Sequence, residues 1–563
     1  MRFFKNVFSK LHIFILWVLI SLFVWGFVFT RITDTSPDKK IVVYVDADEK
    51  DLSDLTAVLN ENKPDGIRMI KVHSVAYNVF DASANAKGDI YILSDATFDE
   101  FSDYIADSPR AEISLAGIGD GLKVYAGVNS VHFMDINGTG DMNGHEVIAE
   151  LRAYSNGSDT EADMISSYYP DSKIEGSSLK VTKVDNISDD FILGMDVSSV
   201  IAEENSGVKY YDFEGNEKDL LQILAENGVT HIRVRVWNHP YDENGNGYGG
   251  GNNDIDTAVQ IGKRASKYGM GLIVDFHLSD FWADPGKQMV PLEWKDLTAD
   301  EKIPAVHDYV RNCLWRLRDE GVDVSMVQIG NETSESMCGE SRWKKICALM
   351  QAGSEAVREV YPDALVAVHF TNPERFTNLL KAAKTLQENE VDYDVFASSY
   401  YPFWHGTLEN LSKVLSRVAD DYDKKVIVME TSYAYRPDDT DFSGNTISDK
   451  TSGIEKPYPF TAQGQADCYR DVVNCIVNDT SNGIGVVYWE GAWITVGTNS
   501  FEENSAKWEK YGSGWASSYA GAYDPKDAGK YYGGSAVDNQ AFFDETGHPL
   551  ESLKVFNLLR YGN

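Results

Sequence analysis

Eight short apolar segments recur between Phe191 and Glu490, and each is followed by a longer stretch that can hold a helix. An apolar run too short for a core helix is typical of a strand buried on both faces of a parallel sheet. Strand and crossover repeats spaced by roughly 30 to 60 residues predict parallel pairing, and eight of them predict a closed (β/α)8 TIM barrel. The predicted strands cover residues 191–197, 231–237, 271–277, 326–332, 365–370, 395–401, 425–431 and 483–490, and helical patterns are legible over 218–227, 254–268, 303–319 and 341–360.

Polar side chains stand at the carboxyl ends of these segments, the face on which barrel active sites are built. Glu332 ends one apolar run, and Glu430 ends another about a hundred residues later. Two carboxylates carried on strand ends are the minimum requirement for a glycoside hydrolase. The other strand ends carry Asp196, Arg233, Arg235, Trp237, Asp275, His277, Asn331, His369, Tyr400, Tyr401, Trp489 and Glu490. Any one of these alone is more often structural, whereas together they fill one face.

The charge of the chain narrows the choice of ligand. The formal net charge is -36 and aromatic residues make up 12% of the chain. Such a charge repels nucleic acid, anionic lipid and acidic polysaccharides, so we expect no nucleic-acid partner and favour a neutral polymer. Aromatic rings stack on sugar faces, although core packing also uses many of them.

The cysteines carry no metal or disulfide pattern. Cys313, Cys338, Cys347, Cys468 and Cys475 give an odd count without a CxxC pair. This spacing indicates neither a zinc site nor a disulfide scaffold, and we expect buried free thiols.

Residues 1–35 have the pattern of a membrane anchor. Arg2, Lys5 and Lys10 precede an uncharged, mostly apolar run from Leu11 to Thr30, long enough to span a bilayer as a helix. Basic residues before the span predict a cytoplasmic N-terminus and an exported remainder. A cleavable signal peptide, which would give a secreted protein, is the alternative. Because no small-x-small cleavage site follows the run, we favour an uncleaved anchor and an extracellular, membrane-attached enzyme.

Residues 36–188 predict a separate α/β accessory region. Strand patterns cover 41–45 and 89–93, and helical patterns cover 51–60 and 97–105. No catalytic constellation is visible there, so a spacer, a partner-binding module and a glycan-binding module stay open. The loop from Asp135 to Glu146 has the oxygen spacing of a calcium loop. The preceding segment has a strand pattern instead of a helical one, and we favour a polar turn.

Long motifs in the second region resemble the endo-β-1,4-galactanases of glycoside hydrolase family 53. The resemblance covers about Asp189 to Leu559, and residues 189–563 are predicted to form the catalytic domain. The motifs are GMDVSS, RVRVWNHPYDENGNGYGGGNND, DFHLSDFWADPGKQ, VQIGNET, VHFTNP, ASSYYPFWHGTL, METSYAY, GVVYWEGAW and GSAVDNQAFFD.

The resemblance implies a retaining enzyme that cuts β-1,4-galactan or arabinogalactan inside the chain. Glu332 is implied as the acid/base and Glu430 as the nucleophile, with carboxyls about 5 to 5.5 Å apart. Glu430 must be ionised to attack, while Glu332 must hold a proton, which repulsion between the two carboxyls favours.

The resemblance also implies a set of substrate-binding residues. Asn331 is implied to hold the sugar 2-hydroxyl, Trp489 to floor the subsite where the bond breaks, and Arg233 and Tyr401 to orient Glu430. His277 and His369 are implied to position other groups. Asp196, Asp275 and Arg235 either support the barrel rim or touch sugar.

A structural calcium ion is the implied cofactor. Bacterial relatives tie two loops with calcium, and the matching candidates here are Asp439, Asp441, Ser443, Asn445, Ser535 and Asp538. Ser443 stands where those relatives have histidine, and oxygen-only ligation suits calcium. A second departure is Gly491, where the family usually has proline.

Two other functions stay open. Strand-end glutamates recur in related barrels, so a mannanase or a xylanase is the alternative within the same class. A non-catalytic, cell-surface glycan-capture protein is the alternative from another class, although both glutamates are present. The expected partners are the polysaccharide and, through the N-terminal helix, the membrane; the protein is expected to be a monomer.

Overall fold

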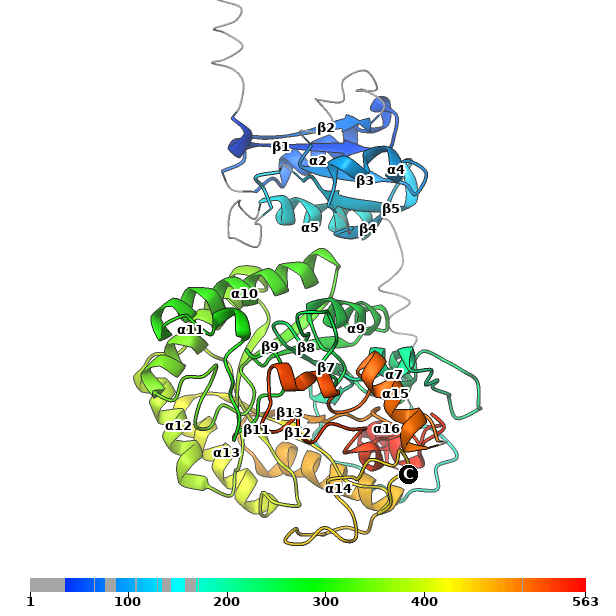
Figure 1. Cartoon of the computed structure of the whole chain (residues 1–563), viewed down its shortest axis with the longest axis vertical. Helices are drawn as coiled ribbons and strands as arrows, with labels where there is room; N and C mark the ends of the chain where they lie inside the picture. The colour runs from blue at the N-terminus through cyan, green and yellow to red at the C-terminus, as the bar shows by residue number, and fades with distance from the viewer. Residues whose placement is uncertain are drawn as a thin grey trace, which may run out of the picture. The chain divides into compact units, whose positions relative to one another are not determined.

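The computed structural model describes residues 36–562, except 65, 76–87, 107–108, 129, 134–142, 157–168, 171 and 499. The chain divides into two compact units, Met1–Ser158 and Asp159–Asn563 (Figure 1). This boundary lies earlier than the predicted one at 188/189. The reason is that the segment before 189 bonds to the barrel unit: the Ile174 N–H donates to Asn557 Oδ1 at 2.9 Å, and the Val184 N–H donates to the Leu559 carbonyl at 2.9 Å.

Two N-terminal predictions fall outside the described residues. The predicted membrane span, Leu11 to Thr30, lies there entirely, and so does most of the loop from Asp135 to Glu146. Among the helices that the structure does describe, none combines the length and the apolar character needed to cross a bilayer.

The first unit is an α/β domain, as predicted. Its sheet has the order β2-β1-β3-β5-β4, with β1 parallel to β2 and β3, and with β5 antiparallel to its neighbours β3 and β4. Leu55 and Leu59 of α2 and Ile148 and Leu151 of α5 are buried in its core. The elements are η1 (Pro37–Lys39), β1 (Lys40–Val45), η2 (Glu49–Asp51), α2 (Ser53–Glu61), β2 (Met69–Ser74), β3 (Ile90–Leu93), α4 (Phe98–Phe101), η4 (Ser102–Tyr104), β4 (Ala111–Leu115), β5 (Gly119–Ala126) and α5 (Asn143–Asn156).

The second unit is a closed barrel of eight parallel strands, which confirms the predicted (β/α)8 fold. The strand order is β10-β11-β12-β13-β6-β7-β8-β9, so each strand pairs with its neighbours in sequence and the last pairs with the first. The strands are β6 (Ile192–Asp196), β7 (His231–Val236), β8 (Gly271–Phe276), β9 (Val324–Ile329), β10 (Leu365–Phe370), β11 (Val395–Ser399), β12 (Lys425–Thr431) and β13 (Gly483–Tyr488).

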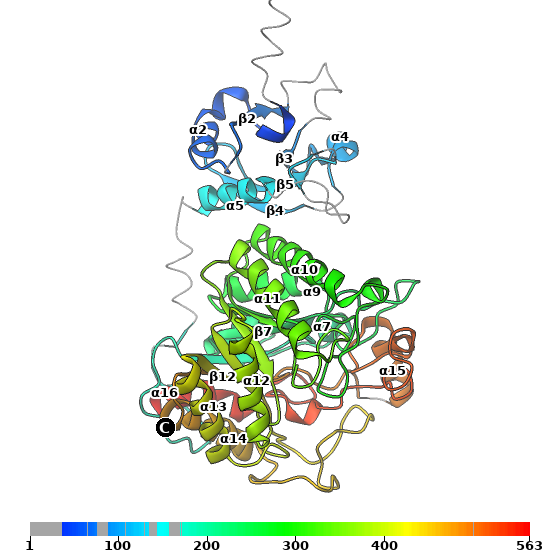
Figure 2. The ribbon, with the colours of Figure 1, turned by 90° about the vertical axis from the view of Figure 1, so that its left-hand side faces the viewer.

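Helices surround the barrel strands, as Figures 1 and 2 show from two sides. They are α7 (Val200–Asn205), α8 (Leu220–Glu226), α9 (Ile255–Lys267), α10 (Ala299–Asp319), α11 (Trp343–Val360), α12 (Phe376–Glu388), α13 (Leu408–Tyr422), α14 (Ala462–Asn474), α15 (Phe501–Tyr511) and α16 (Val555–Tyr561). Short turns of helix lie at η5 (Leu292–Trp294), η6 (Cys475–Asp479), η7 (Ser518–Ala522), η8 (Asp538–Gln540) and η9 (Glu551–Lys554).

Apolar side chains fill one level of the barrel interior. Ile273, Met326, Ala397, Ile427 and Val487, which come from different strands, belong to one buried cluster. This packing closes the barrel to water below the strand ends and makes it a core instead of a pore. The polar groups Asp275 and Gln328 follow Ile273 and Met326 of this cluster by two residues, toward the carboxyl ends of their strands.

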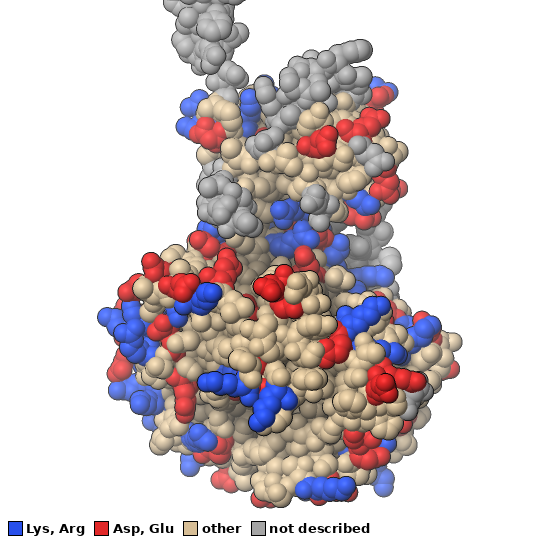
Figure 3. Space-filling view, viewed as in Figure 1, with Lys and Arg blue, Asp and Glu red and all other residues tan. Residues whose placement is uncertain are grey.

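The surface carries both signs of charge. In the face shown in Figure 3, Asp and Glu alternate with Lys and Arg around the barrel unit, and uncharged residues cover much of its middle. All five cysteines are buried and free, as predicted.

Candidate active site

The two glutamates line one cavity of about 320 Å³ at the carboxyl ends of the barrel strands. Glu430 belongs to β12, whereas Glu332 lies beyond the end of β9. The chain turns there through Gly330 at φ 83°, and Glu332 itself has φ 47°. A left-handed conformation at a residue other than glycine costs roughly 1–2 kcal/mol, and such strain is common at functional sites.

Arg233 and Tyr401 bind the carboxylate of Glu430. Arg233 Nη2 donates to Glu430 Oε1 at 3.0 Å, and the Tyr401 hydroxyl donates to Oε2 at 2.9 Å. These are the two partners expected for Glu430. Burial raises the pKa of Glu430, and the positive charge of Arg233 opposes this rise. Both carboxylate oxygens are therefore fixed by donors, and the ionised form is favoured by an adjacent cation.

Among the described residues, no Lys or Arg forms an ion pair with Glu332. Ser399 Oγ donates to Glu332 Oε1 at 2.6 Å, and hydrogen bonds from Ser399 and Thr371 act to lower its pKa. Burial first, and then the negative charge of Glu430, raises the pKa of Glu332 to about 8. Glu332 consequently holds a proton at neutral pH, whereas Glu430 faces Arg233. When the surroundings of two carboxyls push their pKa values apart, one carboxyl can act as the acid and the other as the nucleophile.

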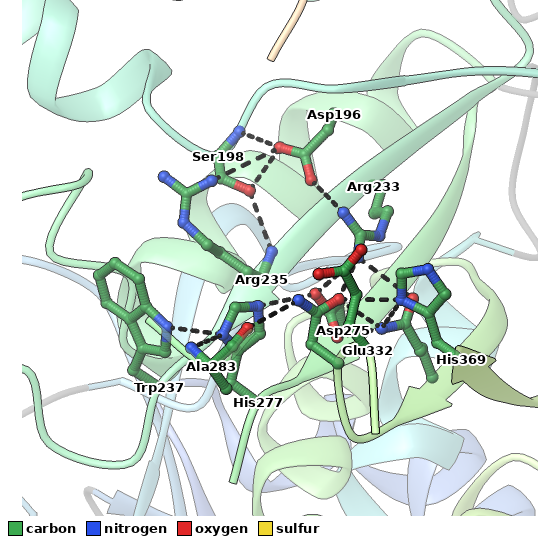
Figure 4. A network of polar contacts seen from close by, with 12 residues as sticks. Asp196, Ser198, Arg233, Arg235, Trp237, Asp275, His277, Ala283, Glu332 and His369 are labelled. Atoms are coloured by element: carbon green, nitrogen blue, oxygen red, sulfur yellow. Dashed lines mark hydrogen bonds and ion pairs between the residues drawn. The ribbon is translucent and has the colours of Figure 1, made fainter. Parts of the chain in front are cut away.

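Two buried aspartates support Arg233. Its guanidinium donates to Asp196 at 2.9 Å and to Asp275 at 2.8 Å (Figure 4). Asp196 and Asp275 are fully buried, neither lines the cavity, and both hold the guanidinium of Arg233. The proximity of Arg233 helps to lower the pKa of Asp275 despite its burial. The position of Glu430 thus depends on three strands besides its own, β6, β7 and β8.

Asn331, His277 and His369 belong to one network of hydrogen bonds that also includes Asp275 and Gln328. His277 contacts Asp275 through Nε2 at 3.0 Å (Figure 4). His369 contacts Asn331 Oδ1 through Nδ1 at 2.9 Å. His277 and Asn331 line the cavity, whereas His369 lies behind this lining and contacts Asn331. Gln328, which sequence reasoning missed, bridges Asp275, Arg233 and Asn331.

Tryptophans form much of the cavity wall. Trp489 lines it, as predicted, and its ring centroid lies 6.4 Å from that of Trp282. The Arg235 guanidinium stacks on Trp282 at 4.3 Å and forms an ion pair with Glu490, so Arg235, which also lines the cavity, braces this wall. The tryptophans that sequence reasoning did not single out are Trp282, Trp404, Trp493 and Trp515.

Local contacts explain why glycine stands at position 491, where the family usually has proline. The Gly491 N–H donates to the Asp196 carbonyl at 3.0 Å, a bond that proline cannot make. A Cβ at this position would lie 2.5 Å from the Met195 sulfur. Proline would lose this hydrogen bond, and any larger residue would require the Met195 side chain to move.

A second carboxylate cluster lies away from the two glutamates. One oxygen from each of Asp439, Asp441 and Asp538 lies within 4.8 Å of the others. Asp441 Oδ2 and Asn445 Oδ1 are buried, and neither has a hydrogen-bond partner among the described residues. Burial and the charge of Asp538 raise the pKa of Asp441 to about 9. Converging carboxylates with unpartnered oxygens fit an oxygen-liganded cation such as calcium.

The two serines predicted for this cluster have other contacts. Ser443 Oγ accepts from the Gly534 N–H at 3.0 Å, and Ser535 Oγ accepts from the Val537 N–H at 3.2 Å. A serine oxygen has two lone pairs, so each can accept such a bond and still face an ion. Asn445 Nδ2 donates to Asp538 Oδ1 at 2.6 Å, which directs the free amide oxygen elsewhere.

A TIM barrel with a proton-holding glutamate, a cation-paired glutamate and a tryptophan-lined cavity at its strand ends is a glycoside hydrolase. Comparison with known proteins agrees. The model of Glycosyl hydrolase family 53 matches residues 192–556. The chain therefore belongs to glycosyl hydrolase family 53.

Individual relatives cover most of the same region. The endo-β-1,4-galactanase of Bacillus subtilis (strain 168) is 55% identical over 393 residues, which are 70% of this chain and 91% of that protein. The arabinogalactan endo-β-1,4-galactanase of Humicola insolens is 32% identical over 54% of this chain and 89% of its own length. The solved Ignisphaera aggregans GH53 catalytic domain has 34% identity and a TM-score of 0.61, covering 68% of this chain and 99% of that domain.

Proposed function

We propose that this protein hydrolyses β-1,4-galactosidic bonds within galactan and arabinogalactan, with retention of configuration. The observation that carries the proposal is the unequal pair of glutamates: Glu332 has a raised pKa and, among the described residues, no ion pair with Lys or Arg, and Glu430 is bound by Arg233. Relatives named as endo-β-1,4-galactanases support the choice of galactan.

In the first step, ionised Glu430 attacks the anomeric carbon. Arg233 and Tyr401 each hold one of its oxygens, so the attacking atom is fixed before the sugar arrives. Glu332 gives its proton to the departing glycosidic oxygen. We assign the 2-hydroxyl to Asn331 and an aromatic contact with the sugar to Trp489, and both residues line the cavity with the two glutamates.

In the second step, Glu332 acts as a base. Esterification of Glu430 removes the negative charge that raises the pKa of Glu332, so this pKa falls and Glu332 is ionised. It then takes a proton from water, and the hydroxide formed releases the sugar from Glu430.

A panel of polysaccharides tests the proposed substrate. The purified protein should cleave linear β-1,4-galactan, and viscosity should fall early relative to the release of reducing ends, because the cuts are internal. Cleavage of xylan or mannan in preference to galactan would refute the substrate class.

We also propose that calcium binds Asp439, Asp441 and Asp538, with Ser443, Asn445 and Ser535 completing the site. The unpartnered oxygens of Asp441 and Asn445 support this proposal. The ion would neutralise the cluster and brace the loops that carry it.

Finally, we propose that Leu11 to Thr30 anchors the protein to the membrane, with the barrel outside the cell and the first unit, up to Ser158, as an accessory domain. The run of about twenty uncharged residues after three basic ones supports this arrangement. Cell fractionation should find the protein with membranes, and protease added to intact cells should digest the barrel. A soluble mature form beginning after about residue 30 would contradict it.

A further inference from the structure

A second cavity lies among the loops next to Glu332. Its volume is about 380 Å³, against about 320 Å³ for the catalytic cavity. It is formed by the loops after β8 and β9, the end of β10 with the loop that follows, and the first two turns of α12. Of the described residues that line it, none also lines the catalytic cavity. The mechanism proposed above therefore leaves this space without a role.

Glu332 stands where the two cavities adjoin. It lines the catalytic cavity, and Ser334, two residues later, lines the second one. In the loop after β8, Asp284 lines the catalytic cavity and the next residue, Pro285, lines the second. Thr371 also lines the second cavity; its backbone N–H donates to Ser334 Oγ at 3.1 Å, and its side chain makes a hydrogen bond that acts to lower the pKa of Glu332. The second cavity therefore begins beside the acid/base.

The nucleophile lies on the other side of the barrel mouth. Glu430 belongs to β12, and in the closed barrel β8 stands opposite β12, with three strands between them in either direction. The second cavity is built on β8, β9 and β10, so it lies on the side of the acid/base. In a retaining hydrolase the attacked sugar lies at the nucleophile, and the acid protonates the oxygen of the part that departs. The position of the second cavity is thus that of the leaving group.

The lining of the second cavity combines an apolar floor with amides at its rim. Phe370 and Leu379 form part of the floor and are almost fully buried. Asn372 and Asn378 line the more exposed part, and among the described residues neither amide side chain forms a hydrogen bond. An amide offers both donors and an acceptor, as sugar hydroxyls require, and an apolar surface suits the C–H face of a sugar ring.

Charge and size also fit an uncharged sugar. Two charged side chains line the second cavity, Arg375 and Glu335, and their charges cancel. Arg375 is mostly exposed and lies 3.4 Å from Glu374, so its charge is already balanced at the surface. The volume falls within the usual range for small-molecule sites, about 300–1,000 Å³. The cavity therefore has no excess charge that would select an ionic ligand.

We propose that the second cavity binds a sugar residue of the leaving group, the part of the polysaccharide that departs when Glu332 donates its proton. This sugar is either the next unit of the galactan backbone or an arabinosyl branch carried by that unit. The inference rests on the proposed function and adds Asn372 and Asn378 as residues that determine specificity. A sugar held here would fix the glycosidic oxygen beside Glu332, so binding away from the reacting bond would speed its cleavage.

A thiol at the rim of the second cavity allows the cavity to be filled. Asn378 is exposed in the first turn of α12, and all five native cysteines are buried, so a bulky maleimide should react with Asn378→Cys at the introduced thiol. The label should lower kcat/KM on galactan about tenfold relative to kcat/KM on an aryl galactoside, whose small leaving group does not extend into the cavity. Thr377→Cys is the matched control, because Thr377 is equally exposed on the same helix and lines neither cavity.

The substrates in this comparison distinguish the two kinds of sugar. A fall on linear galactan assigns the cavity to a backbone unit, and a fall confined to arabinogalactan assigns it to a branch. An unchanged ratio on both polysaccharides would overturn the proposal, and so would an equal fall when the label is on Thr377→Cys.

Protection of the same thiol tests binding without turnover. With Glu430→Ala added to leave the polysaccharide uncut, linear galactan or arabinogalactan should slow the maleimide reaction of Asn378→Cys several-fold and leave that of Thr377→Cys unchanged. Equal reaction rates with and without polysaccharide would overturn the proposal. If the wild type cleaves xylan or mannan instead of galactan, the proposed substrate fails, and both measurements with the cleaved polysaccharide still decide whether the cavity binds the leaving group.

Discussion

Two clusters of carboxylates lie in the barrel unit, and they differ in how their charge is balanced. In the active site, Asp196, Asp275 and Glu430 all contact the guanidinium of Arg233. In the second cluster, Asp439, Asp441 and Asp538 converge, and among the described residues none of the three forms an ion pair with Lys or Arg. The first cluster carries its own cation, whereas the second lacks one.

This difference in charge balance indicates the role of each cluster. A fixed guanidinium favours the ionised form of free Glu430 and holds it in place, as a nucleophile requires. A cluster without a side-chain cation is stable only if its carboxyls are protonated or an external ion is bound. The first cluster should therefore respond to mutation through catalysis, and the second through stability and ion concentration.

The largest expected effect comes from removing the nucleophile. Glu430→Ala should lower kcat on galactan on the order of 10⁴-fold or more, because no group remains to form the covalent intermediate. Azide should restore some turnover with inverted products. Rates are measured by the release of reducing ends. Normal cleavage of an activated aryl galactoside by this variant would reverse the two assigned roles.

Removing the acid/base should lower the rate less than removing the nucleophile does, and the loss should depend on the leaving group of the substrate. Glu332→Ala should lower kcat on galactan by roughly 10²- to 10⁴-fold and largely spare the first step on an aryl galactoside, whose leaving group needs no proton. In the wild type, kcat/KM should fall as pH rises through about 8, because the acid form of Glu332 is lost. A variant equally impaired on both substrates would argue against the acid role.

The internal cation can be removed to test the first cluster directly. Arg233→Met should destabilise the barrel by about 3–5 kcal/mol, because buried Asp196 and Asp275 lose their countercharge. The measurement is chemical denaturation, with Arg316→Met as the control at a partly exposed ion pair worth at most about 1 kcal/mol. Equal losses in the two variants would show that Arg233 does not balance a buried cluster.

Removing an external cation tests the second cluster. Chelation should lower Tm by a few degrees, and added calcium should restore it, since an ion at a hundred times its Kd stabilises the folded state by about 2.7 kcal/mol. Asp441→Ala should abolish this response, and Asp135→Ala, in the N-terminal loop, should not. Unchanged melting of the wild type in excess chelator would remove calcium from this site.

The smallest expected effect is the pH dependence of the calcium response. The folded-state pKa of Asp441, about 9 without an ion, lies above the usual unfolded value of about 4. Its contribution to stability is thus complete below about pH 4 and is lost as pH rises toward 9. Bound calcium would take the place of the proton on Asp441. The rise in Tm on adding calcium should therefore become larger as pH rises over this range. A gain that shrinks with rising pH would contradict the assignment.

Much of the fold was predictable because the barrel is made of local repeats. All eight strands lie within about three residues of their predicted bounds, since apolar runs report burial directly. Helix α10 begins at Ala299, before its predicted start at 303, because Thr298 and Glu301 form a capping box. The domain boundary was placed too late, because its position depends on hydrogen bonds to distant residues such as Leu559.

The catalytic pair was predictable, but its supporting groups were not. Glu332 and Glu430 stand at the ends of apolar runs, whereas Ser399 is one of two adjacent serines on β11. Only Ser399, two residues before Tyr401, shares the face of that strand that meets the site, and strand alternation was the one signal that could have found it. Gln328 and Trp282 lie inside quoted motifs, yet their contacts arise from other strands and loops.

The most direct test of the central claim is proton NMR of the anomeric signals during the first minutes of galactan hydrolysis. Retention through Glu430 and Glu332 requires that new reducing ends appear first in the β configuration, with the α form growing only later by mutarotation. This time course, on oligosaccharides of several lengths, is the predicted result. No cleavage of galactan, or initial appearance of the α form, would contradict the account.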